Sequence, residues 1–275
     1  MGFSAVIRIG VRSCLISLAL GVGSAQALVL AVNEGVTYRV PLSEIRARYE
    51  AIAADLSKLL HQSVSIEPVG DYRTLRAGLA EHRWELALVH PAHVSIQAIK
   101  QSDYRLVAVT KGFTGYKASF LVRADSPLKA LAELKGLRIG APDEDSITAV
   151  MMRATLRDAG VPIVPAVITY TRYQDAVPFF VENRLTHVGV TAASAVIKDW
   201  QAKGGRVMAS STAVPIKHII ASPALSAEQF EKVQAYLVGL DGSDEGKKKL
   251  EPTKWKGFEL YDQAALLKLG AWLGL

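Results

Sequence analysis

The chain has 275 residues, of which 50% are hydrophobic and 21% are charged, the composition of a globular protein with a large buried core. Its formal net charge is +6 at pH 7, but no stripe of lysine and arginine interleaves with aromatic residues, which argues against nucleic acid as a partner. The only cysteine is Cys14, which excludes an internal disulfide.

The first 27 residues have the pattern of a secretory signal peptide. Arg8 and Arg12 supply positive charge, residues 14–23 form a short apolar stretch, and Ala-Gln-Ala ending at Ala27 is typical of a cleavage site. The apolar stretch is far shorter than the ~20 residues needed to cross a bilayer. We therefore expect export to the periplasm with cleavage after Ala27. Cleavage would remove Cys14 and two arginines but no acidic residue, and so lower the net charge from +6 to +4.

Helical and strand patterns alternate from residue 44 onward. Apolar side chains at helical spacing, together with capping residues, predict helices over residues 44–60, 73–82, 126–136, 146–159, 173–183, 193–202, 226–239 and 263–273. Short apolar or alternating runs predict strands over residues 63–69, 85–90, 104–110, 118–122, 137–139, 164–168, 187–191, 206–209 and 217–221. This alternation indicates an α/β fold of βαβ units with mostly parallel sheets flanked by helices.

Two breaks divide the predicted elements, one near residues 111–116 and one near residues 210–215. Two crossings predict a discontinuous arrangement, with a first lobe of residues 28–112 together with 216–275 and a second lobe of residues 113–215. Two lobes joined by two hinge strands enclose a cleft, which is a natural place for a ligand.

The common catalytic motifs are absent. There is no nucleophile elbow, phosphate-binding loop, zinc-protease helix or dinucleotide fingerprint. His90 and His93 come nearest to a metal site, but no third ligand stands at a suitable spacing. The alternative is that they line a polar loop at the carboxyl end of a strand, where α/β proteins bind ligands. We therefore expect no enzymatic activity, no metal and no cofactor.

The order of motifs resembles that of the phosphonate/phosphite-type periplasmic substrate-binding proteins of ABC transporters, which have the type II periplasmic binding fold. The resemblance covers nearly the whole chain after residue 27. Five segments carry it: the tyrosine of Gly70-Asp71-Tyr72, ELALVHPAHV at residues 85–94, residues 115–142 with a hinge tyrosine, YQDAVPFFVENRLTHVGV at residues 173–190, and the return strand and closing helix of residues 214–241.

The resemblance implies two lobes that close on a small oxyanion-bearing solute, such as phosphonate, phosphite or phosphate, and present it to a membrane permease. In that family a Ser-Thr-Ser-Gly turn at a helix N-terminus holds the anion, where N–H groups and the helix dipole favour negative charge. Residues 146–149, Ser-Ile-Thr-Ala, occupy that place here and keep two of the three hydroxyls. Asp143, Glu144 and Asp145 precede them and would oppose a dianion unless they are paired or point away.

The predicted ligand-binding residues follow from these motifs: Tyr72, His90, His93, Tyr116, Ser146, Thr148 and Tyr173. Two alternatives stay open. The tyrosines at 72 and 116 could belong to ordinary packing, and Ser146 and Thr148 could be helix-capping residues alone. Asp145 and Asp175 are weaker candidates, for a positive group on a zwitterionic ligand.

The function predicted from the sequence is that of a monomeric solute-binding protein delivering a small ligand to an ABC permease. The alternative is a periplasmic ligand sensor that hands its bound state to a membrane receptor kinase. A third class, a secreted enzyme or redox accessory protein, would need a reactive pair or a metal cage in the cleft.

Overall fold

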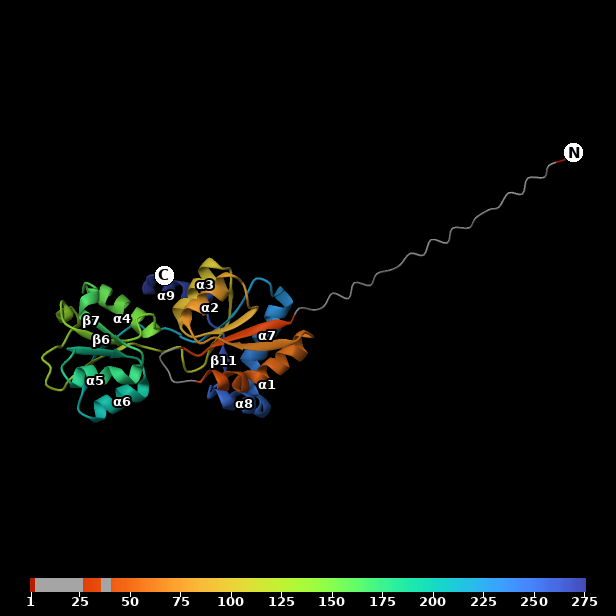
Figure 1. Ribbon diagram of the computed structural model, residues 1–275. Coiled ribbons are helices and arrows are strands. Elements are labelled where there is room, and N and C mark those ends of the chain that lie inside the picture. The colour runs from red at the N-terminus through yellow and green to blue at the C-terminus, as the bar shows by residue number, and fades with distance from the viewer. Residues whose placement is uncertain (3–26, 36–40) are drawn as a thin grey trace.

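The computed structural model describes residues 1–2, 27–35 and 41–275 (Figure 1). Almost all of the predicted signal peptide lies outside these residues, so the peptide and its cleavage site stay predictions. Within the described ranges, no helix is long and apolar enough to cross a membrane.

A six-stranded sheet forms the first of two units, in the order β11-β4-β10-β3-β1-β2. Its strands are β1 (Leu28–Asn33), β2 (Val64–Pro68), β3 (Leu86–Val89), β4 (Arg105–Thr110), β10 (His218–Ala221) and β11 (Phe258–Glu259). Its helices are α1 (Leu42–Leu60), α2 (Tyr72–Ala80), α3 (Ala92–Gln101), α7 (Ala227–Gly239), α8 (Asp244–Leu250) and α9 (Gln263–Leu273). Helices α2, α3 and α9 lie on one side of this sheet, and α1 and α8 lie on the other (Figure 1).

A five-stranded sheet forms the second unit, in the order β7-β6-β8-β5-β9. Its strands are β5 (Ser119–Val122), β6 (Ile139–Pro142), β7 (Ile168–Thr171), β8 (Val188–Thr191) and β9 (Arg206–Ser210). Helix α4 (Ile147–Asp158) lies on one side, and α5 (Val177–Glu182) and α6 (Ser194–Ala202) lie on the other (Figure 1). The chain crosses between the units after β4 and again after β9, and Tyr116 and Val214 of the two crossings form an antiparallel bridge.

Both sheets are mixed, and in each of them most strands run in the same direction, so the predicted α/β fold with mostly parallel sheets is confirmed. Parallel pairing joins β1 to β2 and β3, and β6 to β7 and β8. Strand β10 runs against β3 and β4, and β5 runs against β8 and β9. The physical reason is that β5 and β10 enter their sheets from the opposite unit, and therefore from the opposite end.

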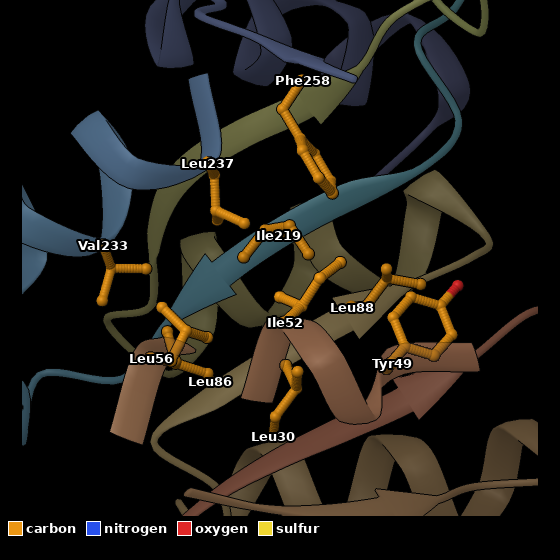
Figure 2. Close-up of a pocket in the computed structure, with 10 residues that line it drawn as sticks. All are labelled: Leu30, Tyr49, Ile52, Leu56, Leu86, Leu88, Ile219, Val233, Leu237 and Phe258. Atoms are coloured by element: carbon orange, nitrogen blue, oxygen red, sulfur yellow. The ribbon is translucent and has the colours of Figure 1, made fainter. Parts of the chain in front are cut away.

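One core lies between the six-stranded sheet and helices α1 and α7. Figure 2 shows its side chains converging around a void of about 10 Å³, which is the least space that one water needs. The Tyr49 hydroxyl points away from the other labelled side chains. Because the lining is otherwise apolar, this void is core packing and not a ligand site.

A second core is continuous between the two units. It joins buried side chains of α3, such as Val94, to those of α4, such as Met151, and to Leu266 of α9. Trp272 of α9 also donates from Nε1 to Asp158 Oδ2 of α4 at 2.6 Å. The two units are therefore packed together along the edge formed by α3, α4 and α9.

Three local predictions fail for identifiable reasons. The helix predicted over residues 126–136 is only a 3₁₀ turn at Leu131–Leu134, and the leucines at 128, 131 and 134 have the three-residue spacing of that turn. The strand predicted at residues 164–168 begins at Ile168, because Pro165 cannot donate to a ladder. His93 lies in the first turn of α3, not in a loop.

Candidate functional site

A cavity of about 760 Å³ lies between the two units, within the size range of small-molecule pockets. Its described walls come from the chain after β1 and β3, from α1, from both crossings, from the turn at residues 253–255 and from the start of α6. The cavity therefore lies at the carboxyl ends of β1, β3 and β8, where α/β sheets bind ligands. Its lining includes residues of α1 and α6, which lie on the other side of the sheets from α3, α4 and α9 (Figure 1).

The cavity wall is rich in positive charge. Arg48, Lys117, Lys217 and Lys254 line it, and Glu34 is the one acidic side chain among its described lining residues. A concave surface lined mainly by one sign of charge concentrates ligands of the opposite sign. The electrostatics of this cavity therefore favour an anion.

Lys217 is the most buried of these cations, with 9% of its surface exposed. Its Nζ atom lies 4.5 Å from the centre of the Phe113 ring and 4.9 Å from that of Trp255, as in a cation–π contact. The nearest carboxylate oxygen is Glu34 Oε2 at 4.0 Å, and within the described part of the chain Nζ makes no hydrogen bond. Burial lowers the pKa of Lys217, while Glu34 acts in the opposite direction.

The carboxylate of Glu34 is engaged by the protein itself. Tyr49 donates from its hydroxyl to Glu34 Oε1 at 2.6 Å, and Arg48 Nη1 lies 3.8 Å from the same oxygen. Burial, and to a lesser extent the charge of Glu34, raises the pKa of Tyr49 well above its usual value, so the hydroxyl keeps its proton. Glu34 therefore compensates nearby cations and leaves the cavity with net positive charge.

A buried network centred on Gln174 fixes the cavity wall in the second unit. Gln174 Nε2 donates to Tyr116 Oη and to Thr148 Oγ1, both at 2.9 Å. Its Oε1 atom accepts from Thr191 Oγ1 and from the Ala192 N–H, both at 2.8 Å. These bonds hold the Tyr116 hydroxyl 3.2 Å from Thr148 Oγ1.

Asp145 forms an ion pair across the two units. Arg76 of α2 donates from Nη1 to Oδ2 at 2.5 Å and from Nη2 to Oδ1 at 2.6 Å, and His93 Nε2 lies 3.4 Å from Oδ1. Burial opposes ionisation of Asp145, but hydrogen bonds from His93 and Arg76 outweigh it and hold the pKa of this carboxyl well below its usual range. The acidic residue nearest the α4 start is therefore paired.

The structure divides the predicted site residues into two groups. His90 and Tyr116 line the cavity, and burial holds the pKa of His90 well below its usual value, so the ring is neutral. Thr148 lies behind Tyr116 and is fully buried. Ser146 is also buried, and its Oγ accepts from the Ala149 N–H as the N-cap of α4.

The remaining predicted residues do not line the cavity. Tyr72 and His93 face each other edge to face at 6.2 Å, beside the Arg76–Asp145 ion pair. Tyr173 is half-buried, with the Arg172 guanidinium 5.4 Å from its ring centre, and it directly precedes Gln174. For all seven residues, contact with a ligand stays a prediction.

Sequence reasoning missed the charged wall itself, because its members come from segments far apart in the chain. Glu34, Lys217 and Trp255 share no local motif, and only the fold brings them together. The one available signal was a lysine directly before the buried strand His218–Ala221. In residues 27–35 and 41–275, no group of three or more His, Cys, Asp or Glu side chains is arranged to hold a metal ion.

Comparisons with solved structures find the same fold. The chain is similar to a protein of Xanthomonas citri bound to ATP (TM-score 0.74, 15% identity, 90% of this chain and 97% of that one). It is similar to PhnD1 of Prochlorococcus marinus in complex with methylphosphonate (TM-score 0.68, 16% identity, 90% of this chain and 97% of that one). It is also similar to a binding-protein component of an ABC phosphonate transporter from Pseudomonas aeruginosa (TM-score 0.64, 18% identity, 90% of this chain and 85% of that one).

No curated protein matches the chain. Residues 35–266 match the family described as ABC transporter, phosphonate, periplasmic substrate-binding protein. These residues are most of the chain and include both sheets except the first strand. The protein therefore belongs to the phosphonate-type family of periplasmic substrate-binding proteins of ABC transporters.

Proposed function

We propose that this protein binds a small anionic solute in the cavity between its lobes and delivers it to an ABC permease, without chemical change to the solute. Here the lobes are the units built on the six-stranded and five-stranded sheets. The observation that carries the proposal is the charge of the cavity wall. Arg48, Lys117, Lys217 and Lys254 line it, and Glu34, the one acidic residue among the described lining residues, is already engaged by Tyr49.

The comparisons support the choice of an anion. One solved relative holds methylphosphonate and another holds ATP, and both ligands carry phosphorus oxyanions. Family membership supports delivery to a permease, because the family is one of transport proteins.

Of the residues predicted from the sequence, His90 and Tyr116 are the ones that we propose to touch the ligand. Thr148 would act through Tyr116, whose hydroxyl it holds in place together with Gln174. We expect the lobes to move about the two crossings when the ligand binds or leaves. The lobe limits of residues 28–112 with 216–275 and 113–215 belong to this proposal.

A thermal-shift screen followed by calorimetry tests the function. The protein after removal of residues 1–27 would be screened against phosphate, phosphite, methylphosphonate, phenylphosphonate, sulfonates, arginine and a neutral sugar. A ligand present at 100 times its Kd stabilises the folded state by ~2.7 kcal/mol. We expect at least one anion to raise the melting temperature. If only the cationic or neutral solutes do so, the anion proposal is wrong.

A further inference from the structure

The following inference rests on the proposed function and concerns the size and the apolar character of the ligand. We propose that the anion binds at the Lys217 end of the cavity and carries a flat or apolar body about the size of a ring, in contrast to a compact oxyanion such as phosphite. Lys217 is then the residue that selects the anionic group. The aromatic side chains of Phe113 and Tyr116 on the first crossing, here called the hinge aromatics, select the apolar body together with the start of α6.

The size of the cavity is the first argument. A cavity of about 760 Å³ lies in the range of pockets that hold drug-sized ligands. A compact oxyanion would leave most of its wall in contact with water. Ligand sites usually bury most of the ligand surface, so the space between the lobes fits a larger molecule.

The state of Lys217 is the second argument. An ammonium group has three hydrogen-bond donors, and burying such a group without acceptors is unfavourable. Lys217 nevertheless lines the cavity with Nζ making no hydrogen bond within the described residues and with Glu34 no closer than 4.0 Å. An anion in the cavity would supply the acceptors that the protein does not.

The chemistry of the remaining wall is the third argument. Phe113 and Tyr116 are half-buried aromatic side chains on one crossing, and Ile216 adds an apolar surface on the other. The start of α6 adds small or apolar side chains, Ala193, Ala195 and Ile197, and one hydroxyl, that of Ser194. Ala193 is the N-cap of α6, and its side chain has no oxygen that could accept from the first N–H groups of this helix.

The turn before α4, where a compact anion would be expected, is occupied by the protein's own bonds. Ser146 Oγ accepts from Ala149, Thr148 Oγ1 is bonded to Gln174, and Asp145 is bonded to Arg76. Neither hydroxyl lines the cavity, and both residues are at most 1% exposed. The Lys217 ammonium, whose donors need an acceptor, and the space for a ligand therefore lie together on the Lys217 side.

Titration calorimetry with matched ligands tests whether an apolar body on the ligand adds affinity. Methylphosphonate and phenylphosphonate share an anionic group, and phenol has the ring without the phosphonate. We expect phenylphosphonate to bind about ten-fold or more tightly than methylphosphonate, because the ring buries apolar surface, and phenol to bind much more weakly than either. Equal or tighter binding of methylphosphonate would overturn the proposal while leaving the proposed function intact. If no anion binds, both fail.

Two pairs of variants test the roles of Lys217 and of the start of α6 in ligand binding. Lys217→Met should weaken phenylphosphonate binding about ten-fold or more, whereas Lys135→Met, an exposed lysine away from the cavity, should not change it. Ala195→Trp should fill part of the cavity and weaken phenylphosphonate binding while leaving methylphosphonate within about two-fold. Ala202→Trp, at the other end of α6, is its control.

Circular dichroism and melting temperatures would establish that each variant is folded. An unchanged phenylphosphonate affinity in folded Lys217→Met would overturn the role of Lys217. Equal losses of both phosphonates in Ala195→Trp would overturn the role of this wall in selecting the body.

Discussion

Replacing Asp145 by asparagine should weaken anion binding, although the change removes a negative charge from the protein. The reason is that Asp145 binds Arg76 across the two lobes with two short hydrogen bonds. Breaking this ion pair favours separation of the lobes and so disfavours the arrangement in which both lobes line the cavity. If Asp145 instead acted mainly by repelling the ligand, the same change would strengthen binding.

The expected magnitude follows from the exposure of the pair. The side chains of Arg76 and Asp145 are 34% and 46% exposed, so solvent screens much of their attraction. A bidentate pair with this exposure contributes about 1 kcal/mol, which corresponds to about a five-fold loss of affinity.

Titration calorimetry with phenylphosphonate at constant ionic strength measures the effect. Glu144→Gln is the matched control, because it removes the same charge from the adjacent, exposed position and should leave the affinity within about two-fold. Tighter binding by Asp145→Asn would refute the interpretation of this ion pair as a contact that holds the lobes together.

Three further changes test the packing and the protonation states. Gln174→Leu removes four side-chain hydrogen bonds of this network. The change should lower the unfolding free energy in urea by about 3 kcal/mol. A loss below about 1 kcal/mol would show that the network is not formed. Burial lowers the pKa of His218 to about 4 from 6.5, so the unfolded chain binds a proton that the folded chain does not, and stability falls as the pH drops through this window, by about 3 kcal/mol for this residue. His218→Gln should therefore flatten the pH dependence of urea unfolding between pH 7 and pH 4, and an unchanged pH dependence would contradict this assignment. Gly78→Ala would place a Cβ 2.2 Å from the fully buried Trp84 ring and should lower the unfolding free energy by about 1–3 kcal/mol; a wild-type melting temperature would contradict this packing.

Much of the fold could be predicted from local patterns in the sequence. The apolar spacing of α1 predicts its buried face, with Ile45, Tyr49 and Ile52 on it, because that face packs on the sheet. The two breaks at the crossings predict that the chain passes twice between two units. The reversed direction of β5 and β10 could not be predicted, since it depends on which end of a sheet each strand enters, and no local pattern encodes that.

The site was predictable only where motifs are local. The hydroxyls of Ser146 and Thr148 could be found because they lie at the start of one helix, but their engagement by Ala149 and Gln174 depends on tertiary contacts. The same holds for Asp145, whose charge suggested repulsion of an anion until the structure placed Arg76 against it. Lys217 could not be identified as a candidate, because its neighbours Phe113 and Trp255 are far away in the sequence.

The central claim is that an anion binds between the lobes at the Lys217 end of the cavity. A crystal structure of the protein in complex with phenylphosphonate tests it most directly. We expect a phosphonate oxygen within hydrogen-bond distance of Lys217 Nζ, about 2.7–2.9 Å, with the phenyl ring between the hinge aromatics and the start of α6. A phosphonate group bound instead by Ser146 and Thr148, with Lys217 making no contact to the ligand, would contradict the claim.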